Sequence, residues 1–275
     1  MSIQTLAGDT LPQPATSRWR SLVTQESVAT VVVSVIVAAA VILPLLVLVI
    51  SSFRVLDSGG FDTAWGLDNY KTLYTDRVIP KAFVNTLIVS AGSTVLATFF
   101  GVTLAWINAR TNCPGRDKLE PYNLIPFFLS PFVGAIAWHN LAGGHTGLLN
   151  SWARDFLGVH GNLFNVDNIY GVIWVTGLFF APLVYLFVVG SLRRMDPSLE
   201  DSARTTGAGL VRTAMTVTLP LVAPGILSGA IIVFVTSAGE FGVPFKLSAP
   251  YGWQTLTTQI FSKAVGDDAN TYLGA

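Results

Sequence analysis

The feature that most constrains this chain is a series of long apolar runs free of charged residues. The first, over residues 28–52, contains no Asp, Glu, Lys or Arg. Its many Val, Ile and Leu residues each contribute roughly 0.3 to 0.6 kcal/mol towards membrane insertion. The run is too long for the apolar core of a signal peptide, and no small-residue cleavage site follows it. We therefore predict a first transmembrane helix over residues 28–53, with a bend at Pro44.

Later runs extend this pattern through the chain. Small residues in the second run would let helices pack closely in lipid. Pro126 and Pro131 in the third run predict either a simple kink or an interrupted helix, which a membrane protein tolerates where the backbone lines a cavity. Only 12% of the 275 residues are charged and 51% are hydrophobic. We predict an all-α membrane protein, a polytopic helical bundle with five spans, the last four over residues 82–107, 121–142, 169–190 and 221–242.

The most polar helical stretch, residues 196–220, lies between the fourth and fifth spans. Asp196 can cap a helix and Pro197 suits a first helical position. Glu200 and Arg204 stand four residues apart, so we expect them to pair on the helix surface. Gly207 is expected to end this helix.

A second short helix is expected after Gly207. Leu210, Thr213, Ala214 and Val217 repeat the helical spacing of three and four residues. The Leu219-Pro220 pair should then break the chain before the fifth span. The stretch is predicted to form two short amphipathic helices joined by a glycine bend.

This stretch resembles the EAA loop of permease subunits from binding-protein-dependent ABC importers. In that family the loop reads Glu-Ala-Ala, then Gly, then Leu-Pro, and the spacing here is the same. Asp201 replaces the usual Glu and Ser202 the first Ala, so an acidic contact would be shorter in reach. The resemblance implies a coupling helix that sits in a cleft of the cytoplasmic ATPase subunit. The residues that it assigns to this contact are Asp201, Ser202, Ala203, Gly207, Ala208, Leu219 and Pro220.

The resemblance also implies how the rest of the chain is divided. Residues 1–27 form a polar N-terminal lead-in, residues 81–242 the permease core, and residues 243–275 an extracytoplasmic tail. The family's core usually adds a helix after such a segment, so a sixth span is expected to be missing at the C-terminus. A fragment, or the first half of a duplicated permease, would account for this.

Basic residues give the expected orientation. If every span crosses, a modest excess of Arg and Lys lies on one side, which places the N-terminus and the coupling loop in the cytoplasm. The expected location is the bacterial cytoplasmic (inner) membrane, with several passes. The basic residues on the cytoplasmic side would be Arg18, Arg20, Arg110, Arg116, Lys118, Arg193, Arg194, Arg204 and Arg212.

Glu240 is the acidic residue of interest at the end of the fifth span. It lies in Gly239-Glu240-Phe241-Gly242-Val243-Pro244, where it would either face a translocation path or reach outer water. This phrase resembles permeases of the ferric iron type most, with the polyamine, sulfate and phosphonate types close behind. The resemblance therefore implies ferric iron as the best guess for the solute.

Partners follow from what the sequence lacks. It has no G-x-x-x-x-G-K-[ST] phosphate loop, so ATP should bind a partner ATPase and this chain should be neither an enzyme nor a cofactor binder. The resemblance implies two further partners, a solute-binding protein outside and a second permease copy or paralogue, and the apolar runs imply membrane lipid. A net charge of zero gives no indication of nucleic acid.

Metal chemistry is not expected. His139, His145 and His160 lie at no metal-ligand spacing, and Cys113 is the only cysteine.

Two other functions stay open. One is an ion-coupled secondary transporter with Glu240 as proton carrier, against which the spans offer almost no other ionisable group and no inverted repeat. The other is a truncated membrane scaffold that transports nothing.

Overall fold

The computed structural model describes residues 25–56, 62–144, 147–158 and 161–265. They belong to two compact units, one up to Leu67 and the other from Asp68 onward. Most of the polar lead-in predicted over residues 1–27 lies outside the described residues.

The first unit consists of a long apolar helix and a small hairpin. The helix α1 spans Gln25–Ser52, with Pro44 inside it. The strands β1 (Arg54–Leu56) and β2 (Asp62–Trp65) then pair antiparallel. Apolar side chains of α1 are exposed on all sides of the helix, as expected of a helix that contacts lipid. This helix corresponds to the first predicted span.

The described part of the second unit consists of helices and the loops that connect them. The elements are α2 (Asp68–Thr75), α3 (Val78–Arg110), α4 (Arg116–Asn123), α5 (Ile125–Phe128), α6 (Pro131–Ala142), α7 (Leu148–Leu157), α8 (Ile169–Arg194), α9 (Ser198–Thr205), α10 (Leu210–Thr213), the π-helical turn η2 (Ala214–Thr218), α11 (Leu219–Ala238), α12 (Gly242–Leu247), the 3-10 turn η3 (Ala249–Tyr251) and α13 (Leu256–Val265).

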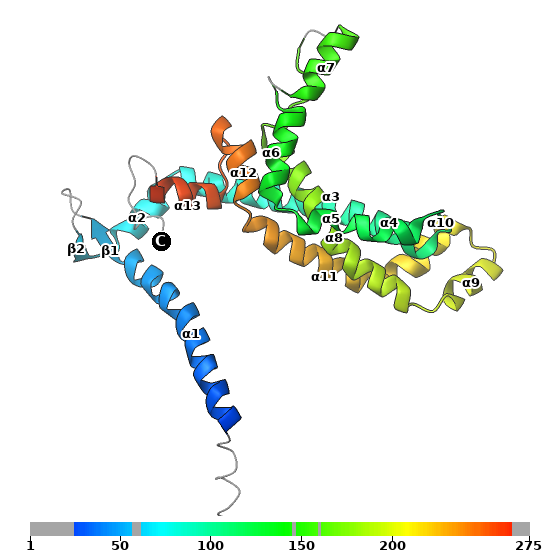
Figure 1. The fold of residues 1–275 in the computed structure, drawn as a ribbon, viewed down its shortest axis with the longest axis horizontal. Coiled ribbons are helices and arrows are strands. Elements are labelled where there is room, and N and C mark those ends of the chain that lie inside the picture. Colours follow the sequence, from blue (N-terminus) through cyan, green and yellow to red (C-terminus); the bar gives the residue numbers. More distant parts are fainter. Residues whose placement is uncertain (1–24, 57–61, 145–146, 159–160, 266–275) are drawn as a thin grey trace, which may run out of the picture. The chain divides into compact units, whose positions relative to one another are not determined.

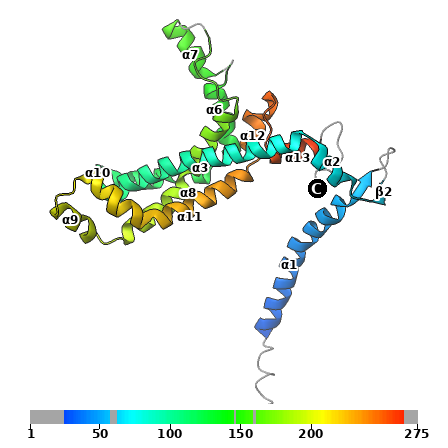
Figure 2. The ribbon, with the colours of Figure 1, turned by 180° about the vertical axis from the view of Figure 1, so that it is seen from behind.

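Three long helices, α3, α8 and α11, lie side by side and form the bundle (Figures 1 and 2). The central helix α8 is the most buried of them. Arg110 at the end of α3 donates a hydrogen bond from Nη2 to the carbonyl of Leu192 near the end of α8, at 3.0 Å. Both helices therefore finish at the same end of the bundle, and α11 runs back in the opposite direction.

Because α3 and α8 run in the same direction, residues 111–168 must return the chain along the bundle. The third span, predicted over 121–142, is interrupted: α4, α5 and α6 replace a single helix. Pro126 lies in the first turn of α5 and Pro131 in that of α6, where a missing N–H leaves no helical bond unmade. Within the described residues, four helices are long and apolar enough to span a membrane, over 28–52, 78–110, 169–194 and 210–238.

The chain after α11, predicted as an extracytoplasmic tail over residues 243–275, packs against the bundle in its described part, up to residue 265. The helix α12 packs against α6 and α8, and α13 against α3. Asn85 of α3 donates from Nδ2 to the carbonyl of Gln254 at 2.9 Å. Lys263 of α13 pairs with Asp76 at 3.2 Å. Two buried apolar residues of α12, Val243 and Leu247, explain why this short segment folds onto the bundle.

Two glycines allow α3 and α11 to approach α8 at the same residue. A Cβ on Gly101 of α3 would lie 2.7 Å from the Cβ of Val184, and one on Gly229 of α11 would lie 3.0 Å from the Cα of Val184. Such close backbone approach supplies the van der Waals contact that holds helices together in lipid. Val184 is fully buried between them.

We predict that Gly101→Ala destabilises the bundle whereas Gly190→Ala does not. The new methyl group at residue 101 would also lie 2.8 Å from the carbonyl oxygen of Ala181, so backbone must move. Overpacking of this kind costs about 1 to 3 kcal/mol. Gly190, which lies in α8, has open space around its Cα. Thermal unfolding of the detergent-purified variants measures the difference, and equal midpoints would contradict the prediction.

Candidate functional site

The helix α9 begins as the sequence predicts. Asp196 accepts a hydrogen bond at Oδ1 from the backbone N–H of Ser198, at 2.9 Å. This bond and one from the Ser198 hydroxyl hold the pKa of Asp196 below its ordinary value. Pro197 directly precedes the helix with a φ of −59°, which a proline adopts without strain.

The end of α9 depends on Gly207. Its φ is +90°, a left-handed conformation that residues with a Cβ rarely adopt. The N–H of Gly207 donates to the carbonyl of Arg204 at 2.9 Å, and that of Ala208 to the carbonyl of Ala203 at 3.1 Å. These two bonds form a Schellman motif, which ends the helix and turns the chain towards α10.

The sequence also predicted a break in the helix at Leu219-Pro220, and this prediction is wrong. The helix runs on from α10 into α11, over residues 210–238, through the π-helical turn η2. Pro220 lies in the first turn of α11. A proline removes one N–H and crowds the carbonyl four residues before it, and a wider π turn just upstream accommodates both effects without ending the helix.

An ion pair that the sequence did not predict lies beneath α9. Glu200 was expected to pair with Arg204, but its Oε1 accepts from Nε of Arg110 at 3.0 Å. The same oxygen accepts from the hydroxyl of Thr218 at 2.7 Å. The side chains of Arg110 and Glu200 are 14% and 11% exposed. Glu200 and Arg110 are 90 residues apart in sequence, so no local spacing indicates the contact.

The residues assigned to the coupling loop lie at one end of the bundle, on and after α9 (Figure 1). Asp201, Ser202 and Gly207 are exposed, and Ala203 and Ala208 are half-buried. Leu219 and Pro220 are also exposed but belong to the first turn of α11 rather than to a loop.

Glu240 lies at the opposite end of α11, before α12. Its Oε1 accepts hydrogen bonds from the backbone N–H groups of Gly242 at 3.0 Å and Val243 at 3.3 Å. Its carbonyl accepts from the hydroxyl of Thr257 at 2.9 Å. The carboxylate therefore satisfies the free N–H groups at the start of α12. Its predicted place in a translocation path stays a prediction.

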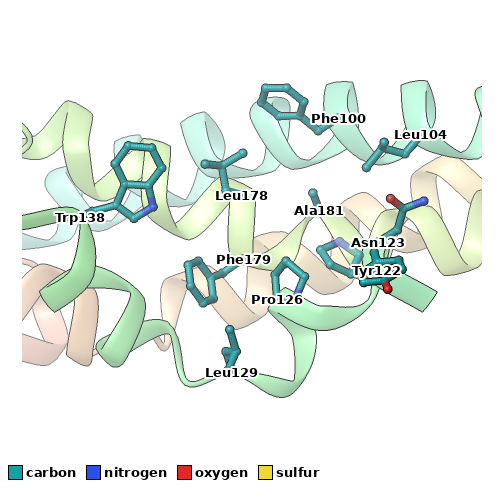
Figure 3. Close-up of a pocket in the computed structure, with 11 residues that line it drawn as sticks. Phe100, Leu104, Tyr122, Asn123, Pro126, Leu129, Trp138, Leu178, Phe179 and Ala181 are labelled. Atoms are coloured by element: carbon teal, nitrogen blue, oxygen red, sulfur yellow. The ribbon is translucent and has the colours of Figure 1, made fainter. Parts of the chain in front are cut away.

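A cavity of about 360 Å³ lies between α3, the interrupted segment and α8 (Figure 3). No charged side chain lines it, and its walls are mainly aromatic and aliphatic, so it offers nothing to neutralise a charged solute. The interruption at α5 contributes Pro126 and Leu129 to the wall. The other lining residues are Phe100, Leu104, Tyr122, Asn123, Trp138, Leu178, Phe179, Ala181 and Pro182.

The one histidine in the described part of the chain, His139, pairs with an acid. Its Nδ1 lies 2.6 Å from Oδ1 of Asp167, whose Oδ2 accepts from the N–H of Gly144 at 3.1 Å. Burial raises the pKa of Tyr251 above its ordinary value, and the charge of Asp167 raises it further. His145 and His160 lie outside the described residues. Among those described, no group of three His, Cys, Asp or Glu side chains gathers as metal ligands would.

Comparisons with known proteins identify the family of this chain. Residues 97–264 match the family of binding-protein-dependent transport system inner membrane components. The chain is 30% identical over 190 residues to a probable molybdenum ABC transporter permease of Haloferax volcanii. That match covers 68% of this chain and 65% of the relative, less than two thirds of its length. This chain is also 29% identical over 196 residues to the sulfate permease CysW of Synechocystis, and that match covers 71% of this chain and 69% of CysW.

A solved structure has the same fold. A bacterial alginate ABC transporter, crystallised with a periplasmic protein that holds an alginate pentasaccharide, superposes with a TM-score of 0.71. The match covers 94% of this chain and 89% of the other at 17% identity, so it compares the fold alone. With the family match over more than half of its length, the chain belongs to the inner membrane components of binding-protein-dependent transport systems, the permease subunits of ABC importers.

Proposed function

We propose that this chain carries a small solute across the cytoplasmic membrane and is driven through α9 by a partner ATPase. The observation that carries the proposal is the exposed α9 helix, ended at Gly207 by its Schellman motif and held at one end of the bundle. The spacing of Asp201, Gly207 and Leu219 matches the EAA loop, and the family membership supports the same role for it.

The surface around α9 has the composition of a protein interface. Leu199 of α9 is exposed, as are Leu210, Val211 and Met215 on and after α10. Asp201 and Arg204 add charges of both signs beside these apolar groups. Apolar anchors surrounded by polar groups suit burial against a partner. Because ATP is hydrolysed in the cytoplasm, this end of the bundle would be the cytoplasmic one.

The mechanism that follows is alternating access. A loaded solute-binding protein would dock at the outer end, where α2, α12 and α13 lie, while ATP brings two ATPase subunits together inside. A second permease copy or paralogue would complete the path, and ATP would be held by the ATPase subunits. ATP can shift the conformational equilibrium only if α9 contacts the ATPase differently in the two states. The periplasmic protein bound to the alginate transporter supports a partner of this kind.

For the solute we propose an oxyanion such as molybdate or sulfate. The two relatives named above are permeases for molybdenum and sulfate, and neither supports the ferric iron that the Gly239–Pro244 phrase implied. The structural role of the Glu240 carboxylate agrees with an anionic solute, because an unpaired carboxylate in the path would repel it.

We predict that Gly207→Val abolishes uptake and capture of the ATPase, whereas Gly209→Val preserves both. Valine at a φ of +90° is strained and would alter the exit of α9. Gly209 has a φ of −68° and a ψ of 165°, which a β-branched residue adopts readily, and open space around its Cα. Pull-down in mild detergent with mass spectrometry and whole-cell uptake measure the effect, and membrane insertion of both variants is checked first.

Two outcomes would contradict the assignment of α9. If Gly207→Val still captures the ATPase and transports, α9 is not the coupling element. If Gly209→Val loses both as completely, the left-handed backbone at Gly207 is not what the contact requires.

We further predict that deleting the gene lowers uptake of radiolabelled molybdate or sulfate at least severalfold and leaves ferric iron uptake unchanged. Re-expression of the chain should restore the lost uptake. A loss confined to ferric iron would overturn the oxyanion proposal while leaving the importer assignment intact.

A further inference from the structure

Four helical elements are joined through one buried ion pair, Arg110–Glu200. The carboxylate of Glu200 in α9 accepts two hydrogen bonds. One comes from Nε of Arg110 at the end of α3, and the other from the hydroxyl of Thr218 in the turn that leads into α11. Arg110 also donates from Nη2 to the carbonyl of Leu192 in the last turns of α8, at 3.0 Å. We call Arg110, Glu200 and Thr218 the α9 joint.

Separating Arg110 from Glu200 would cost free energy. A buried carboxylate that loses one partner becomes an uncompensated charge, which is strongly destabilising. Arg110 is suited to its position because the planar guanidinium donates in two directions at once, to Glu200 and to a free carbonyl at the end of α8. A lysine has a single ammonium group and cannot reproduce this fixed fork.

Thr218, the third residue of the α9 joint, lies where the π-helical turn η2 passes into α11. Thr218 is the last residue of η2, and π-helical turns are often found at functional sites. Its hydroxyl is buried and donates to Glu200 over 2.7 Å, so this bond joins the start of α11 directly to α9. Without it, η2 would be free to absorb motion of α9 before the motion reached α11.

We propose that Arg110, Glu200 and Thr218 are positioning residues that make α9 move as one body with α3, α8 and α11. The inference rests on the proposed function, since it assumes that an ATPase moves α9. It assigns the joint to transmission: binding of the ATPase depends on the exposed face of α9, and conversion of hydrolysis into uptake depends on the buried face.

A second ion pair at the same end of the bundle provides a control. Glu120 of α4 and Arg193 of α8 approach to 2.7 Å, but their side chains are 31% and 53% exposed. Solvent-exposed pairs of this kind contribute little to stability. Glu120 makes no contact with α9 among the interactions described above, so its loss should not affect transmission.

The test uses the full transporter, reconstituted in liposomes from this chain, the ATPase subunits that co-purify with it, and its binding protein. The readouts are ATP hydrolysed, radiolabelled molybdate or sulfate taken up, and the thermal unfolding midpoint of each purified variant. Thr218→Val keeps the shape of the side chain and removes the hydroxyl, whereas Thr218→Ser keeps the hydroxyl. Loss of one hydrogen bond to a charged group should lower uptake per ATP by about tenfold in Thr218→Val, with hydrolysis retained. Thr218→Ser should stay near wild type.

The ion pair is tested by Arg110→Gln, Glu200→Gln and the double variant. Each single change should lower uptake per ATP while the ATPase still co-purifies. Because the two side chains act on each other, the double variant should lose no more than the worse single variant. Glu120→Gln should leave the ratio unchanged.

Each outcome decides a different question. If the wild type brings no ATPase and hydrolysis is not linked to uptake, the proposed function itself fails. If the wild type is coupled and Thr218→Val and the ion-pair variants keep its ratio, the joint does not transmit motion. If hydrolysis and uptake fall in proportion, together with the thermal midpoint, the joint is only structural and the inference is overturned.

Discussion

Close packing of α8 against two neighbours is the constraint on which the rest of the bundle depends. Val184 is enclosed by glycines of α3 and α11, and any side chain on those glycines would meet the backbone or Cβ of α8. When helices associate within lipid, no apolar surface is removed from water. Van der Waals contact of this kind is therefore the main source of helix association. The buried bond from Asn108 Nδ2 to the hydroxyl of Tyr185, at 2.8 Å, then fixes how far α3 is displaced along α8.

The same packing determines what can be built at the end of the bundle. Because α3 and α8 finish together, Arg110 reaches both a terminal carbonyl of α8 and Glu200 of α9. A short helix such as α9 is marginal by itself, since nucleation is costly and only tertiary contacts repay it. The buried carboxylate supplies that contact from one face and leaves the opposite face of α9, with Asp201 and Ser202, open to a partner.

Local chemistry explains which parts of this site could be predicted. Capping by Asp196 and the end of α9 at Gly207 depend on residues a few positions apart, so sequence spacing was sufficient for both. The apolar runs also predicted where α1, α3, α8 and α11 lie, because the hydropathy of a segment reflects how readily it inserts into lipid. The Arg110–Glu200 pair depends on helices far apart in sequence. The break expected at Pro220 failed because a π turn, which no residue pattern marks, absorbs the proline.

The packed segment after α11 was missed for a related reason. Residues 243–265 are too polar and too short to predict as membrane helices, and their order comes from contacts with α3, α6 and α8 rather than from their own propensity. Two of these contacts, from Asn85 to Gln254 and from Leu256 N–H to the hydroxyl of Thr86 at 2.8 Å, join residues 169 and 170 positions apart in the sequence.

The placement of charge bears on the source of energy. Residues 82–107 of α3, 169–192 of α8 and 219–238 of α11 contain no Asp, Glu, Lys, Arg or His. A proton-driven secondary transporter uses ionisable groups at membrane depth to bind and release the proton. Here the nearest acid, Glu240, is occupied by the N–H groups of α12, and the ion pairs of Arg110 and of Lys263 lie at opposite ends of α3. The charged contacts of these three helices therefore lie at their ends, and α9 is an exposed helix joined to α3, α8 and α11 at one of those ends.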